Sequence, residues 1–90
     1  MIVYQVTVLI SHEAEKEWTL WMRDQHIPAV MATGYFSGFR FTKDGLAHII
    51  EYDCETLEKL TAYQAGPAVA LQKEHSERYA GHFTASRKII

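Results

Sequence analysis

The sequence predicts an α+β fold in which one four-stranded antiparallel sheet carries its helices on a single face. Three observations support this prediction. Four stretches alternate between two faces with a period of two, as β-strands do. Stretches with helical spacing separate the first strand from the second and the third from the fourth. Asp44-Gly45, the strongest hairpin signal in the chain, joins the second and third strands directly.

The first strand is predicted at Ile2–Ile10, because its residues alternate between a fully apolar face and a mixed one. Ser11 is the expected N-cap of the next helix, since glutamates follow it at the positive end of the helix dipole. Trp18, Trp21 and Met22 recur at helical spacing. They predict a stripe that packs against the sheet.

A proline should interrupt this first helix. Pro28 has no amide proton and restricts Ile27 before it, so we expect a break or kink near His26–Ile27. Proline suits the first position of a helix, so a short turn should run from Pro28 to about Ala32. Gly34 then ends it.

The remaining strands and helices are predicted from the same two spacings. Strands are predicted at Tyr35–Lys43, Leu46–Asp53 and His82–Ile90, and helices at Leu57–Gln64, capped by Thr56, and at Ala68–Tyr79, opened by Pro67. Gly38 within a strand indicates a bulge or a close backbone approach. With right-handed crossovers the order of elements gives the ferredoxin-like arrangement.

Composition describes one small globular domain over residues 1–90, with 48% apolar and 22% charged residues. A net charge of −2 with scattered basic residues excludes the electrostatic footprint of a nucleic-acid partner. No window approaches the ~18 apolar residues of a membrane span, so no membrane partner is expected. Met1 leads into the first strand without a secretory signal, and Cys54 is the only cysteine. These features predict a cytoplasmic protein.

The sequence also lacks the motifs of several chemistries. Its five histidines form no H-x-x-x-H or H-E-x-x-H pair, so we expect no metal site. The nucleophile elbow G-x-S-x-G and a glycine-rich phosphate loop are both absent, and we expect no cofactor.

Two segments carry a family resemblance. Trp18–Phe36 reads W-x-x-W-M-x-x-x-H-I-P-x-V-x-A-T-G-x-F, and Glu74–Tyr79 reads E-H-x-x-R-Y, followed by Phe83, Ala85 and Arg87. The chain resembles a family of short bacterial proteins known only as a domain of unknown function. This chain departs from the family after Phe41, where relatives often carry a longer loop and this chain has little beyond Asp44-Gly45. The resemblance implies membership of the dimeric α/β-barrel proteins, including EthD-like and antibiotic-biosynthesis-monooxygenase-like ones, in which two sheets pack face to face. It carries over no catalytic residue.

Four residues form the candidate ligand site. His26 lies at the expected helix break, and His48 and Tyr52 alternate onto the sheet face that Tyr4 shares. A pocket lined by Trp21, His26, His48 and Tyr52 would have an apolar wall and a few polar groups, as small-molecule sites do. His26 is the candidate general base. In the alternative interpretation these side chains only reach backbone acceptors at the edge of the core. Arg40 is more typical of a solvated or interface charge than of an anion clamp.

Three functions remain open. The first is the binding of a small apolar or aromatic molecule between helices and sheet, the second is a cofactor-free monooxygenase- or isomerase-like activity, and the third is a purely structural dimerisation module. A homodimer is expected because four apolar residues lie on the sheet face away from the helices: Val3, Leu9, Ala47 and Ile49. Facing two such sheets would hide both patches.

Overall fold

The computed structural model describes residues 1–90. Along the chain the elements are β1 (Ile2–Ile10), α1 (His12–Trp21), the π-helical turn η1 (Met22–His26), α2 (Ile27–Ala32), β2 (Gly38–Asp44), β3 (Ala47–Cys54), α3 (Leu57–Ala65), α4 (Pro67–Arg78) and β4 (Phe83–Ile89). The strands form one antiparallel sheet in the order β2-β3-β1-β4. This order is the ferredoxin-like one, so the predicted fold class is confirmed.

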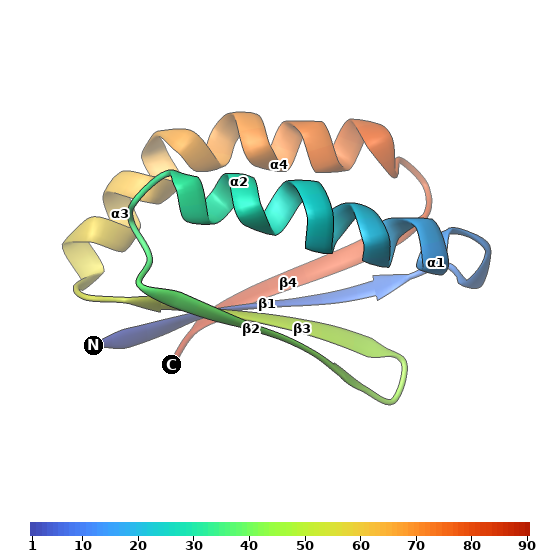
Figure 1. Cartoon of the computed structure of the whole chain (residues 1–90), viewed down its shortest axis with the longest axis horizontal. Helices are drawn as coiled ribbons and strands as arrows, with labels where there is room; N and C mark the ends of the chain where they lie inside the picture. Colours follow the sequence, from blue (N-terminus) through green and yellow to red (C-terminus); the bar gives the residue numbers. More distant parts are fainter.

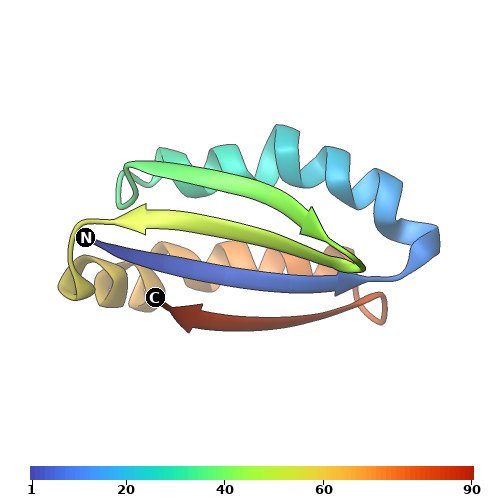
Figure 2. The same ribbon diagram turned by 90° about the horizontal axis from the view of Figure 1, so that it is seen from below.

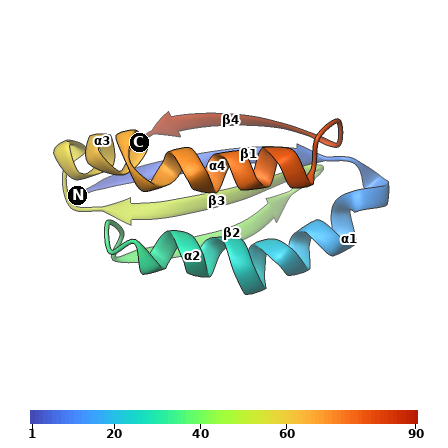
Figure 3. The same cartoon turned by 90° about the horizontal axis from the view of Figure 1, so that it is seen from above.

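All helices cover one face of the sheet, and the opposite face is left uncovered (Figures 1 and 2). Seen from above, α1 and α2 lie beside α4, and the helices extend roughly along the direction of the strands (Figure 3). None of these helices combines the length and the apolar character needed to cross a membrane.

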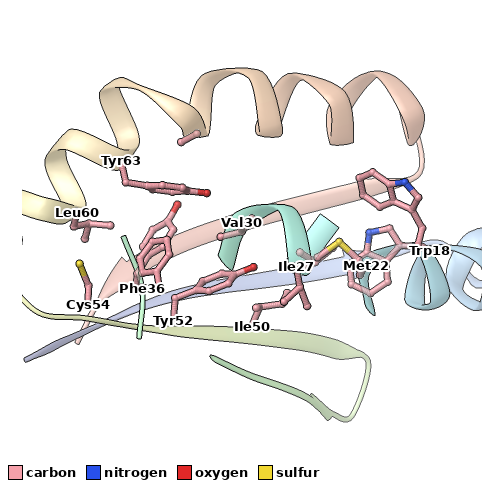
Figure 4. Packing of buried hydrophobic residues seen from close by; sticks show 14 of the residues in the cluster. Trp18, Met22, Ile27, Val30, Phe36, Ile50, Tyr52, Cys54, Leu60 and Tyr63 are labelled. Carbon is pink, nitrogen blue, oxygen red and sulfur yellow. The ribbon is translucent and has the colours of Figure 1, made fainter. Parts of the chain in front are cut away.

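The strand register explains which residues face the helices. Tyr4 lies opposite Tyr52, and Val8 lies opposite His48, in the pairing of β1 with β3. All four are buried, because the even-numbered positions of both strands point into the helical layer. The expectation that His48 and Tyr52 share a face with Tyr4 is therefore correct. Figure 4 shows the packed core, which extends from Leu60 beneath α3 to Trp18 of α1.

The helix does not break near His26–Ile27, but its regular α-helical geometry is interrupted there by the π-turn over Met22–His26. The backbone stays helical through His26 and Ile27, and the amide of Ile27 donates to the carbonyl of Met22, five residues back. The widened π-turn keeps the helix continuous ahead of Pro28, whose missing amide would break an ordinary α-helix. The short turn from Pro28 does end at Ala32, as predicted, and Gly34 follows with a φ of +82°.

The other boundaries differ from the predictions only locally. The strand β2 begins at Gly38 rather than Tyr35, because Phe36 turns into the core and packs 4.7 Å from the ring of Tyr63. A Cβ at Gly38 would lie 3.3 Å from a side-chain carboxylate oxygen of Asp53, so the close neighbour of Gly38 is a side chain rather than a backbone. The register with β3 is regular from Gly38 onward, without a bulge. Ser11 precedes α1 as expected, but its hydroxyl bonds to His82 instead of capping the helix.

Candidate functional site

An interior cavity of about 40 Å³ lies between the helices and the sheet. It is lined by residues from η1, α2, α3, α4 and three of the strands. Apolar walls come from Val6, Val8, Met22, Val30, Ile50 and Ala85, and the polar or aromatic groups are Tyr4, His26, Tyr52, Tyr63, Gln72, His75 and Arg87. In Figure 4 the hydroxyl groups of Tyr52 and Tyr63 point into the space between helices and sheet.

Two polar atoms at this cavity are buried without a hydrogen-bond partner. They are the hydroxyl of Tyr4 and Nδ1 of His26, and no other side-chain nitrogen or oxygen in the chain shares this condition. Folded proteins pair nearly all their buried polar atoms, so each exception calls for an explanation. Both exceptions here lie on the same cavity.

The two histidines of the cavity are neutral at pH 7. Their ring centroids are 5.7 Å apart. Burial, followed by the positive charges of His75 and Arg87, lowers the pKa of His26 to about 4. Burial and Arg87 lower the pKa of His75 to about 4 as well. The indole of Trp18 donates a 2.9 Å hydrogen bond to Nε2 of His75, so the proton of that neutral ring is on Nδ1.

The three tyrosines of the cavity form one aromatic cluster. The ring of Tyr4 lies 6.2 Å from that of Tyr52 and 6.3 Å from that of Tyr63. Burial raises the pKa of Tyr52 far above its ordinary range and that of Tyr63 to about 12. Burial also raises the pKa of Tyr4, although the charge of Arg87 and the polar side chains of Arg87 and Gln64 near the hydroxyl oppose it. The hydroxyls are therefore protonated and can donate hydrogen bonds.

The structure brings two of the four predicted site residues to the cavity, His26 and Tyr52. Trp21 packs beside two histidines of the cavity, with ring centroids 5.1 Å from His26 and 5.8 Å from His75, but it does not line the cavity itself. Its other neighbours are Tyr79 and the guanidinium of Arg78. It supports His26 from outside the cavity.

His48 lies elsewhere on the same sheet face. Its ring packs 4.8 Å from Trp18, and its Nε2 lies 2.7 Å from a carboxylate oxygen of Glu15. Hydrogen bonds from Lys43 and His48 lower the pKa of Glu15 to about 2. The single pocket expected from Trp21, His26, His48 and Tyr52 is therefore divided: Glu15 and Lys43 hold His48 at the other end of the sheet.

Sequence reasoning left Tyr63, His75 and Arg87 out of the site. His75 lies on the predicted inward stripe of α4, so its burial could have been anticipated. Arg87 lies on the same inward face of β4 as Phe83 and Ala85. A charged residue on an otherwise apolar face was the feature of the sequence that could have indicated its role. No group of three or more histidine, cysteine or acidic side chains could hold a metal ion.

A family model described as a domain of unknown function (DUF4286) matches residues 1–90. No curated protein matches the chain.

Solved structures share the fold. The heme degrader MhuD from Mycobacterium tuberculosis, with two hemes bound in its active site, gives a TM-score of 0.74 at 20% identity, over 100% of this chain and 93% of MhuD. A mutant of MhuD with two manganese protoporphyrin IX molecules per active site gives 0.75 at 21% identity, over 100% and 92%. An EthD family protein from Bacillus halodurans gives 0.69 at 13% identity, over 98% and 97%. At these identities the likeness establishes the ferredoxin-like fold alone.

Proposed function

We propose that this chain, which belongs to the DUF4286 family, binds a small apolar or aromatic molecule in the cavity between its helices and its sheet. The observation that carries the proposal is the pair of unpartnered atoms, the Tyr4 hydroxyl and His26 Nδ1, on one cavity. Leaving a buried polar group unpaired costs about 1–3 kcal/mol. A ligand with a hydrogen-bonding group would remove that penalty, which favours binding.

The size of the cavity limits the ligand. Its volume of about 40 Å³ is close to the ~30 Å³ that one water occupies in the liquid. Anything larger enters only if side chains at the rim move outward. Gln72 is half-buried and Arg87 is exposed, so both can move without disturbing the core.

The porphyrins of the MhuD structures do not fit this cavity. Sites for ligands of ordinary size enclose about 300–1,000 Å³, many times the space between helices and sheet here. The proposal therefore names a molecule much smaller than heme.

The state of His26 favours binding over general-base catalysis. A catalytic base works best with a pKa near the operating pH, whereas that of His26 is lowered to about 4. Its neutral ring is suited to accept or donate a hydrogen bond. The π-turn that carries His26 supports a specific role, because such turns are frequent at functional sites.

Substitution of Tyr4 by phenylalanine separates a binding role from a structural one. Tyr4→Phe removes an unpaired buried hydroxyl, so we expect it to raise the free energy of unfolding of the ligand-free protein by about 1 kcal/mol. We expect the same variant to weaken binding of the probe benzyl alcohol, measured by thermal shift and calorimetry. Tyr35→Phe is the matched control, since Tyr35 is half-buried and lies outside the cavity lining.

Each outcome is informative. A melting temperature of the wild type that rises with benzyl alcohol, and rises less in Tyr4→Phe, supports the site. If saturating benzyl alcohol leaves the wild-type melting temperature unchanged, the binding function is wrong and the dimerisation module remains.

The uncovered face of the sheet supports the second part of the proposal, a homodimer with its sheets face to face. This face combines Val3, Leu9 and Ile49 with charged side chains, most of which are paired. Arg40 binds both oxygens of Asp53 at 2.9 Å, and Gln5 donates to Glu51. Lys88 lies on the same face of the edge strand β4 and is exposed. A second sheet can cover the paired charges without leaving a lone buried charge, provided that Lys88 at the edge stays in contact with water.

A further inference from the structure

Arg87 is the only arginine of this chain without an ion pair. The other three are paired with carboxylates: Arg23 with Asp24, Arg40 with Asp53, and Arg78 with Glu17. An arginine carries its charge at any physiological pH and presents a planar fork that matches a carboxylate. The unpaired guanidinium of Arg87 is thus available to an anion from outside the chain.

The position of Arg87 directs this charge toward the cavity. It lies on the edge strand β4, opposite Val6, and this register places it on the same face as Ala85, beneath the helices. Both Ala85 and Arg87 line the cavity. The charge of Arg87 acts on the residues inside the cavity, since it contributes to lowering the pKa of His26 and of His75.

The cavity holds a cation and no anion. None of its 13 lining residues is acidic, and the histidines and tyrosines among them are neutral at pH 7. The Tyr4 hydroxyl is buried, and no acceptor in the protein meets it at hydrogen-bond geometry. The side chains of Arg87 and Gln64 are nevertheless near enough to lower its pKa. A charged donor at the rim and an unsatisfied neutral donor inside are complementary to a single carboxylate.

We propose that the ligand is a monocarboxylate with a small apolar or aromatic body, and that Arg87 and the hydroxyl of Tyr4 bind its carboxylate. The body of the ligand then lies against Val6, Val30 and Ile50. This inference rests on the proposed binding function and names the class of ligand.

An arginine on an edge strand has a second explanation, because charged residues there discourage pairing with strands of other molecules. Lys88 makes the two explanations separable. It follows Arg87 on the same strand and points to the opposite face, opposite Gln5. Removing either charge changes the edge equally, but only Arg87 lines the cavity.

The test compares benzoate with benzyl alcohol, which differ in charge but hardly in size, by calorimetric titration of the full chain. We expect benzoate to bind the wild type more tightly than benzyl alcohol. In Arg87→Gln we expect the Kd of benzoate to rise by about tenfold or more, since a hydrogen bond to a charged group is lost. Lys88→Gln should change it by less than about twofold, as removal of an exposed charge does. Arg87→Lys should retain part of the preference for benzoate, and its melting temperature reports whether position 87 tolerates substitution.

The result also distinguishes this inference from the proposed function. If benzyl alcohol binds as tightly as benzoate, or if Lys88→Gln weakens benzoate as much as Arg87→Gln, the carboxylate assignment is overturned while binding stands. If neither probe binds the wild type, the binding function itself fails.

Discussion

His26 and His75 couple the stability of the fold to pH. Burial lowers the pKa of each to about 4, from an ordinary value of 6.5. Between those values the unfolded chain binds protons that the folded chain does not. Stability is therefore fully present above pH 6.5 and falls as the pH drops toward 4. At pH 5 each histidine should account for a loss of about 1–2 kcal/mol.

The variant His26→Gln tests this directly, because glutamine keeps hydrogen-bonding capacity but does not titrate. The free energy of unfolding is measured by urea titration at pH 7.5 and at pH 5. We expect the loss between these two pH values to be about 1–2 kcal/mol smaller in His26→Gln than in the wild type. His12→Gln is the control, since His12 is exposed and remote from the cavity. Equal losses in His26→Gln and the wild type would mean that His26 is not held neutral.

Individual residues also show how much of the candidate site can be predicted from the sequence. Alternation correctly placed both His48 and Tyr52 on the helical face. However, four residues of a strand span about 13 Å, and alternation does not say which helix crosses at which point. That depends on packing: Trp18 covers His48, whereas the interior cavity opens over Tyr52. Arg87 was missed because a charged residue near the end of a chain is usually solvated.

At the scale of helices, strands and turns, the sequence predicted the structure correctly where a single residue determines the backbone conformation. Asp44-Gly45 forms the predicted turn, with Gly45 at a φ of +61°. The sequence located the interruption ahead of Pro28 but not its form, because the backbone could accommodate the proline without breaking the helix. A π-turn leaves room for Pro28 without ending the helix, and no propensity of Met22–His26 announces it. The consequence matters for the site, since Met22, His26 and Val30 all reach the cavity from this continuous helix.

Gly34 offers a test of how the helical segment ends. Its φ of +82° is strained for residues with a Cβ, although a Cβ there would meet no atom within 4 Å. We expect Gly34→Ala to lower the free energy of unfolding by about 1–2 kcal/mol, measured by chemical denaturation. Gly34→Asn should lose less, because asparagine tolerates the left-handed region. Equal stability of Gly34→Ala and the wild type would show that this conformation is not required.

At the scale of the whole molecule, the helices cover one face of the sheet and leave the other open (Figure 2). Leu9 on that face is 50% exposed, and Val3 and Ile49 are half-buried. The pairing of β1 with β3 brings Leu9, Ala47 and Ile49 close together, whereas the pair Gln5–Glu51 separates them from Val3. Exposed apolar side chains gathered on one face are typical of interaction surfaces. We expect two copies of this face to meet about a twofold axis, as in most homodimers.

We therefore expect light scattering at micromolar concentration to give about twice the chain mass of 10.3 kDa. Ile49→Lys places a charge within the open face and should shift the protein toward the monomer, since a lone buried charge in an interface is strongly unfavourable. Leu20→Lys is the matched control: Leu20 is 44% exposed but lies on α1, in the helical layer. Far-UV circular dichroism establishes that both variants keep their fold. A monomeric wild type, or equal dissociation of the two variants, would contradict a dimer through this face and leave its apolar residues to another partner.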